Sequence, residues 1–152
     1  MRYLIALLGL ALILPHPAAA QAYDWRPVNH DTAGMIKAGQ YDAARPIIED
    51  ALANCPNAVT PTEAGLCTAI FSENLANVRE HQGDLIGAEA DLRKMVEVRT
   101  SVLPANDPLI GQARFFLALF FERHGRRAEE IASLQTAEAI ARADGPTQRS
   151  EL

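Results

Sequence analysis

A block of this sequence recurs at a fixed distance. The triplet Asn74-Leu75-Ala76 is followed seven residues later by Gly83, and 42 positions further on Phe116-Leu117-Ala118 is followed in the same way by Gly125. A weaker copy of the block ends at Gly39. Self-similarity at a period of this size is typical of folds in which one small unit is stacked on the next. The sequence therefore predicts a repeat scaffold and makes catalysis less expected.

Apolar residues recur at spacings of three and four along most of the chain, which indicates amphipathic helices. Thr60 or Thr62 can cap one helix, and Asp107 followed by Pro108 is a typical start for another. No segment alternates with a period of two. We therefore predict an all-α fold, an α-solenoid of three antiparallel helical hairpins. The expected helices cover residues 31–38, 42–54, 60–82, 84–102, 108–124 and 126–143.

The first 20 residues have the pattern of a secretory signal peptide. Arg2 precedes an apolar run over residues 4–14, and residues 18–20 supply an Ala-x-Ala cleavage site. The run is shorter than the roughly 20 apolar residues that span a bilayer. We expect cleavage near Ala20 or Ala22, a periplasmic or secreted protein, and no stable membrane insertion afterwards.

The rest of the chain divides into three predicted parts. Residues 21–30 have mixed polarity and include Pro27, so they are expected to form an irregular lead-in. Residues 31–143 form the helical repeat domain. Residues 144–152 begin with an Asp-Gly-Pro helix-ending sequence and are expected to form a flexible tail.

The charge balance argues against nucleic acid as a partner. The chain carries 14 Lys and Arg against 19 Asp and Glu, a net charge of −5. Binding to phosphates requires a concentrated positive surface, which this composition does not supply.

The chain has two cysteines, Cys55 and Cys67. In an oxidising compartment such a pair usually forms a disulfide, which would contribute about 3 kcal/mol for so short a loop. The alternative is a buried free thiol, because Cys67 lies four residues before Phe71 and eight before Leu75 on an apolar helical face. No metal-ligand spacing is present, so no bound metal or cofactor is expected.

The hairpins resemble tetratricopeptide repeats. That family has Gly at the bend of each hairpin, a large apolar residue two positions later and Ala three positions after that. The first two units match this pattern, whereas Gly125 is followed by Arg127 and Glu130. The 42-residue period is similar to the longer kinesin-light-chain type of repeat. The resemblance covers about residues 31–143, and it implies a superhelix whose concave groove holds peptides. The matching residues are Gly39, Tyr41 and Ala44 in the first unit and Gly83, Leu85 and Ala88 in the second.

No local signature joins a nucleophile to a base, so no catalytic residue is predicted. His81 and His124 lie at the ends of first helices, where an imidazole is favourable at the negative end of the helix dipole. We interpret both histidines as structural. A less expected alternative is an enzyme or a small-molecule site that uses His81 and Glu80.

The first helices of the hairpins supply the candidate binding groove. It combines a polar strip from the second unit with an apolar patch from the third, which suits an extended or helical segment of another protein. The alternative is that Phe115 and Leu119 pack against the sixth helix, the tail or a second copy of the chain. The candidate groove residues are Glu73, Asn77, Glu80 and His81, and one period later Phe115, Leu119, Glu122 and Arg123.

The function expected from these patterns is that of an exported, non-enzymatic adaptor or scaffold that binds a protein or peptide. The alternative is a homo-oligomeric structural module of the cell envelope that associates with itself through Phe115 and Leu119.

Overall fold

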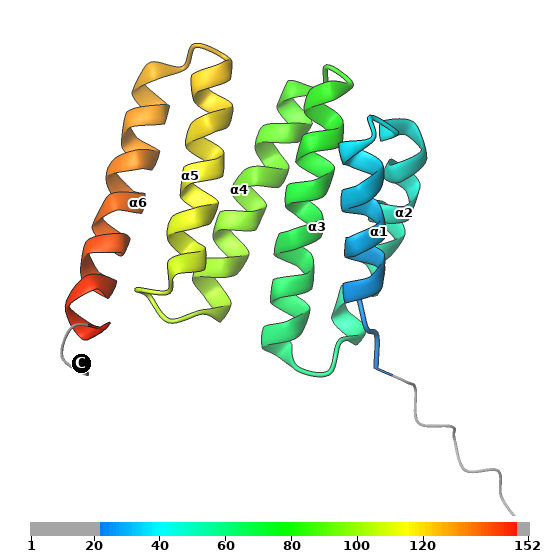
Figure 1. The fold of residues 1–152 in the computed structure, drawn as a ribbon, viewed down its shortest axis with the longest axis horizontal. Coiled ribbons are helices and arrows are strands. Elements are labelled where there is room, and N and C mark those ends of the chain that lie inside the picture. Colours follow the sequence, from blue (N-terminus) through cyan, green and yellow to red (C-terminus); the bar gives the residue numbers. More distant parts are fainter. Residues whose placement is uncertain (1–21, 149–152) are drawn as a thin grey trace, which may run out of the picture.

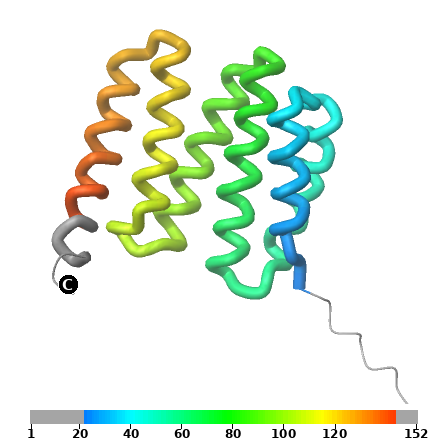
Figure 2. Tube along the Cα trace, in the orientation of Figure 1, coloured from blue at the N-terminus to red at the C-terminus, as the bar shows by residue number. Residues whose placement is uncertain are grey.

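The computed structural model describes residues 22–148, and it confirms the all-α prediction. The described helices form three antiparallel hairpins that are stacked side by side in chain order (Figures 1 and 2), and residues 22–148 include no strand. Residues 1–21, which include the predicted signal segment, and residues 149–152 lie outside the described range. Within that range no helix is long and apolar enough to cross a membrane. The helices are α1 (Arg26–Lys37), α2 (Tyr41–Asn54), α3 (Pro61–His81), α4 (Leu85–Val102), α5 (Pro108–Arg123) and α6 (Arg127–Gln148), with a short 3-10 helix η1 (Cys55–Asn57) after α2.

Each hairpin bends at a glycine. Gly39, Gly83 and Gly125 have φ values of 72°, 83° and 69°, a left-handed conformation that other residues rarely adopt. At each bend the next residue closes the helix end: the N–H of Asp84, for example, donates to the carbonyl of Arg79 at 2.9 Å. This is the Schellman arrangement, which satisfies carbonyls that the helix end leaves free. The same backbone motif therefore turns the chain in all three hairpins.

Side chains close the beginnings of three helices. The Thr60 hydroxyl accepts from the N–H of Glu63 at 3.1 Å, and the Asp107 carboxylate accepts from the N–H of Leu109 at 2.8 Å. Asp84 does the same for α4, accepting from the N–H of Gly87 at 2.9 Å. Such caps supply acceptors for backbone donors that have no partner within the helix.

The two ends of the helical domain differ from the prediction. The irregular lead-in over residues 21–30 is wrong from Arg26 onward, where α1 begins. Pro27 lies in the first turn, where a missing N–H breaks no helical bond, and Asn29 donates to the Trp25 carbonyl at 3.0 Å. The predicted end near residue 143 is also wrong, because α6 continues to Gln148.

Two groups of buried apolar side chains form the core, and α3 belongs to both. Phe71, Leu75 and Val78 of α3 face α1 and α2, whereas Ala69 and Ala76 face α4 and α5. The position of α3 is thus fixed from two sides.

Cys55 and Cys67 form a disulfide, with their Cα atoms 5.5 Å apart. Both residues are fully buried. The bond joins the end of α2 to the first half of α3, so it holds the first hairpin against the second.

Removing this disulfide should destabilise the protein by about 3 kcal/mol, because the open chain regains the loop entropy that the bond removes. The test is urea unfolding of the double variant Cys55→Ala, Cys67→Ala against the wild type. Reductant should lower the stability of the wild type by a similar amount and leave the double variant unchanged. Equal stability of oxidised wild type and double variant would contradict the prediction.

The stacking leaves a space between α3 and α5. Helix α4 packs against both, whereas the backbones of α3 and α5 do not come into contact. Figure 1 shows α4 lying behind the gap between them. The side chains along this gap form the candidate site.

Candidate functional site

An open cavity of about 250 Å³ lies between α3 and α5, and it is called the α3–α5 groove below. Helix α3 supplies one wall, α5 supplies the other, and Leu92 of α4 contributes to the lining between them. The lining combines charged, amide and apolar groups. Its residues are Glu73, Ala76, Asn77, Glu80, Leu92, Phe116, Leu119 and Arg123.

Five of the eight candidate residues line this groove, namely Glu73, Asn77, Glu80, Leu119 and Arg123. The other three do not. His81 is exposed and its ring stacks on Tyr41 of α2, with ring centroids 4.3 Å apart. Glu122 is also exposed, and Phe115 lines a different cavity. Phe115 and Leu119, which were expected to form one patch, thus line different cavities.

Glu80 joins α3 to α5 at the end of the groove nearest the hairpin bends. Arg123 donates from Nε and Nη2 to the two carboxylate oxygens at 2.8 and 2.7 Å, and Nε2 of His124 lies 2.8 Å from Oε1. Burial alone would raise the pKa of Glu80, but the hydrogen bonds from Arg123 and His124 hold that pKa below its usual value. Both carboxylate oxygens of Glu80 thus already accept hydrogen bonds within the protein.

A buried arginine lies beside the other acidic residue of the groove. Arg99 of α4 is only 4% exposed, and its Nη1 donates to the Leu109 carbonyl and to Gln112 Oε1, both at 3.0 Å. Its Nη2 lies 3.4 Å from Glu73 Oε2. Burial lowers the pKa of Arg99, and it raises the pKa of Glu73 even though Arg99 opposes that shift. Arg99 therefore ties the three helices together at a position where both charges have lost solvation.

Arg99 was not among the predicted groove residues, although the sequence contains a signal for it. Arg99 follows Met95 by four residues and Val96 by three, so it continues the apolar face of α4. A charged residue on a core-facing stripe is uncommon, and it indicates a buried ion pair or hydrogen-bond network.

A second cavity, of about 640 Å³, lies between α5 and α6. Its lining is mostly apolar, and it includes two unusually exposed side chains, Phe115 at 45% and Ile131 at 41%. Exposed apolar surface of this kind often marks an interaction site. The protein thus presents a polar groove on one side of α5 and an apolar cavity on the other.

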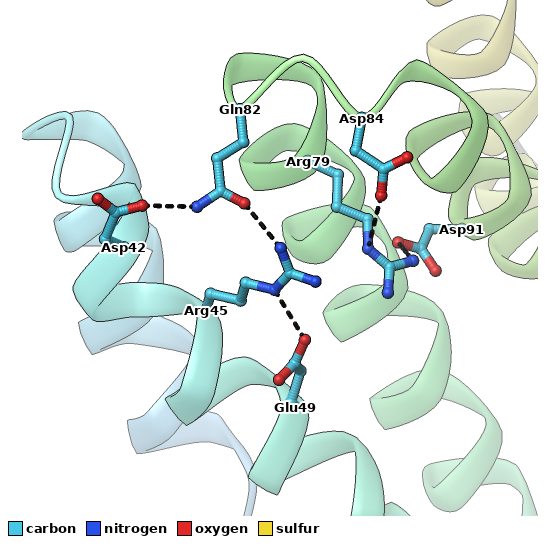
Figure 3. Close-up of polar contacts among 7 residues, drawn as sticks. All are labelled: Asp42, Arg45, Glu49, Arg79, Gln82, Asp84 and Asp91. Atoms are coloured by element: carbon cyan, nitrogen blue, oxygen red, sulfur yellow. Dashed lines mark hydrogen bonds and ion pairs between the residues drawn. The ribbon is translucent and has the colours of Figure 1, made fainter.

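The polar residues around the bend between α3 and α4 form hydrogen bonds and ion pairs with each other (Figure 3). Arg45 of α2 donates to Gln82 Oε1 at 3.0 Å, and Gln82 donates in turn to Asp42 at 2.7 Å. On α3, Arg79 donates to Asp91 at 2.7 Å. Since these contacts link α2 to the end of α3, and α3 to α4, we interpret them as structural.

Among residues 22–148 no three His, Cys, Asp or Glu side chains gather in a way that could hold a metal ion. His81 and Glu80, the pair considered for catalysis, have separate partners: His81 stacks on Tyr41, and Glu80 binds Arg123 and His124. Comparison with known proteins returned no match among family models, curated proteins or solved structures.

Proposed function

We propose that this protein is an exported, tetratricopeptide-like adaptor that holds a short extended segment of another protein in the α3–α5 groove and catalyses no reaction. One observation carries the proposal: five residues predicted from the repeat register line a single open cavity between α3 and α5. Polar groups that fix orientation next to apolar walls are typical of sites that bind other molecules.

The size and rigidity of the groove support a peptide segment as the occupant. A cavity of about 250 Å³ has room for one or two side chains of a partner rather than for a folded domain. Its two walls are joined by the ion pair of Glu80 with Arg123 and by the contacts that the buried Arg99 makes with Glu73 on α3 and with α5. A preformed groove loses less entropy on binding than one that must close around its ligand.

The proposed compartment is outside the cytoplasm. The leader pattern supports export, and a disulfide between buried cysteines is typical of oxidising compartments.

The groove can be tested by filling it. Asn77→Arg places a long side chain on its wall, and Asn106→Arg makes the same chemical change at an exposed turn residue outside the groove. Peptides selected from a random library against the wild type should bind Asn77→Arg at least about tenfold more weakly, since about 1.4 kcal/mol of lost contact has that effect. Binding is measured by fluorescence polarisation.

Asn106→Arg is the control and should bind these peptides like the wild type. Unchanged binding by Asn77→Arg would place the peptide site elsewhere, and a library that yields no binder would argue against the adaptor function.

A second candidate function is self-association through the cavity between α5 and α6. It is favoured by the exposed Phe115 and Ile131, which replace the Phe115 and Leu119 pair expected from the sequence. Sedimentation velocity over a wide concentration range would exclude this function if the protein stayed monomeric.

A further inference from the structure

Glu73 has unused hydrogen-bonding capacity in the α3–α5 groove. Within the described residues its carboxylate makes one polar contact, with Arg99 Nη2 at 3.4 Å, which is long for a charged pair. An ionised carboxylate can accept about four hydrogen bonds. The side chain remains 34% exposed and lines the cavity, so a ligand can reach it.

The negative charge of Glu73 is only partly neutralised by the positive side chains around it. Arg99 shares its donors with the Leu109 carbonyl and with Gln112, and burial raises the pKa of Glu73 despite Arg99. Arg123, the cation among the groove-lining residues, is held in two hydrogen bonds by Glu80. An incoming positive group would therefore meet an available carboxylate and no free competing cation among the groove-lining residues.

The rest of the groove suits an alkyl chain. Leu92, Phe116 and Leu119 line the same cavity as the Glu73 carboxylate. Asn77, one helical turn after Glu73, adds an amide oxygen that can accept a hydrogen bond. Lysine and arginine side chains have the matching form, an apolar stem with a positive head.

We propose that the groove receives a lysine or arginine side chain of the bound segment, with its stem against Leu119 and Phe116 and its positive head on Glu73. This inference rests on the proposed peptide-binding function and names the chemistry of the partner. It also gives a reason for a partly exposed carboxylate in the cavity wall whose one polar contact among the described residues is a long one to Arg99.

The stability of Glu73→Gln separates this role from a structural one. A raised pKa in the folded protein means that the ionised form of Glu73 is disfavoured there, so stability falls as the pH rises from the ordinary carboxyl range through the raised pKa. Glu73→Gln removes this cost, and the amide oxygen of glutamine can still accept the hydrogen bond from Arg99. We therefore expect the variant to keep the wild-type melting temperature or exceed it at neutral pH. If Glu73 served only to pair with Arg99, Glu73→Gln would instead have a clearly lower melting temperature than the wild type.

The binding test uses capped pentapeptides of Gly and Ser with one central lysine, arginine or norleucine. Norleucine keeps an alkyl stem and lacks the positive head. Binding is followed by NMR through the Leu119 methyl groups and the Asn77 side-chain amide. We expect the cationic peptides to bind at least about fivefold more tightly than the norleucine peptide, a ratio that corresponds to about 1 kcal/mol, the net value of a typical hydrogen bond.

Two variants test whether the preference for cationic peptides depends on Glu73. Glu73→Gln should abolish it, whereas Glu122→Gln, which removes the same charge from an exposed residue outside the cavity, should preserve it. Equal binding of lysine and norleucine peptides, or an unchanged preference in Glu73→Gln, would overturn the cation pocket and leave peptide binding intact. Peptides that shift no groove signal at saturating concentration would overturn both proposals.

Discussion

Replacing Phe71 with alanine should lower the free energy of unfolding by about 3 to 5 kcal/mol, the usual cost of removing a phenyl ring from a core. Phe71 is fully buried on α3, in the cluster that includes the disulfide and the apolar faces of α1 and α2. The cost combines lost burial with the cavity left behind, because the disulfide and two packed helices limit how far the surroundings can relax. Urea unfolding measures the change.

Phe115→Ala is the matched control, since it removes the same ring from a residue that is 45% exposed. We expect a loss of less than about 1 kcal/mol there, because an exposed ring leaves no closed cavity. Similar losses in the two variants would mean that Phe71 is not packed as described. Because α3 also forms one wall of the groove, Phe71→Ala should weaken peptide binding too.

The parts of the fold that local chemistry determines could be predicted. Gly83 ends a helix because left-handed backbone is needed there, and that requirement is visible in the chain itself. Asp107 and Thr60 cap helices through bonds to residues only two or three positions away. The apolar spacing that identified α3 likewise depends on the helical period alone.

Features that depend on packing were predicted less well. The start of α1 was missed because Pro27 was interpreted as a breaker, whereas at a helix start it is favourable. The repeat register identified candidate groove positions, but it could not show that Phe115 and Leu119 line different cavities. That separation arises from how α4 and α6 pack on the two sides of α5.

Replacing Arg99 with methionine should destabilise the protein by about 1 to 3 kcal/mol, the range for leaving partly buried polar groups without their hydrogen-bond partner. Methionine retains an unbranched stem and part of the packing, and it removes the charge and the donors. The loss arises because Glu73 loses its cation, while the Leu109 carbonyl and Gln112 lose a donor. Arg99→Lys keeps the charge but not the planar set of donors, so it should give a smaller loss.

The pH dependence of the stability lost in Arg99→Met shows how much of that loss is electrostatic. Arg99 opposes the upward shift in the pKa of Glu73, so Arg99→Met should raise that pKa further above the value in the unfolded chain. The folded variant then binds more protons than the unfolded chain over a wider range, and its stability falls as the pH rises through that range. Urea unfolding should therefore show a larger loss at neutral pH than at mildly acidic pH.

Combining Arg99→Met with Glu73→Gln should recover part of the stability at neutral pH, because the uncompensated carboxylate is then absent. The two single variants and the double variant form a cycle whose coupling measures the Arg99–Glu73 interaction directly. An Arg99→Met loss that is the same at both pH values, together with zero coupling, would show that Arg99 acts only through Leu109 and Gln112. In that case Glu73 would be free of any structural partner, and its presence in the groove would depend on the ligand alone.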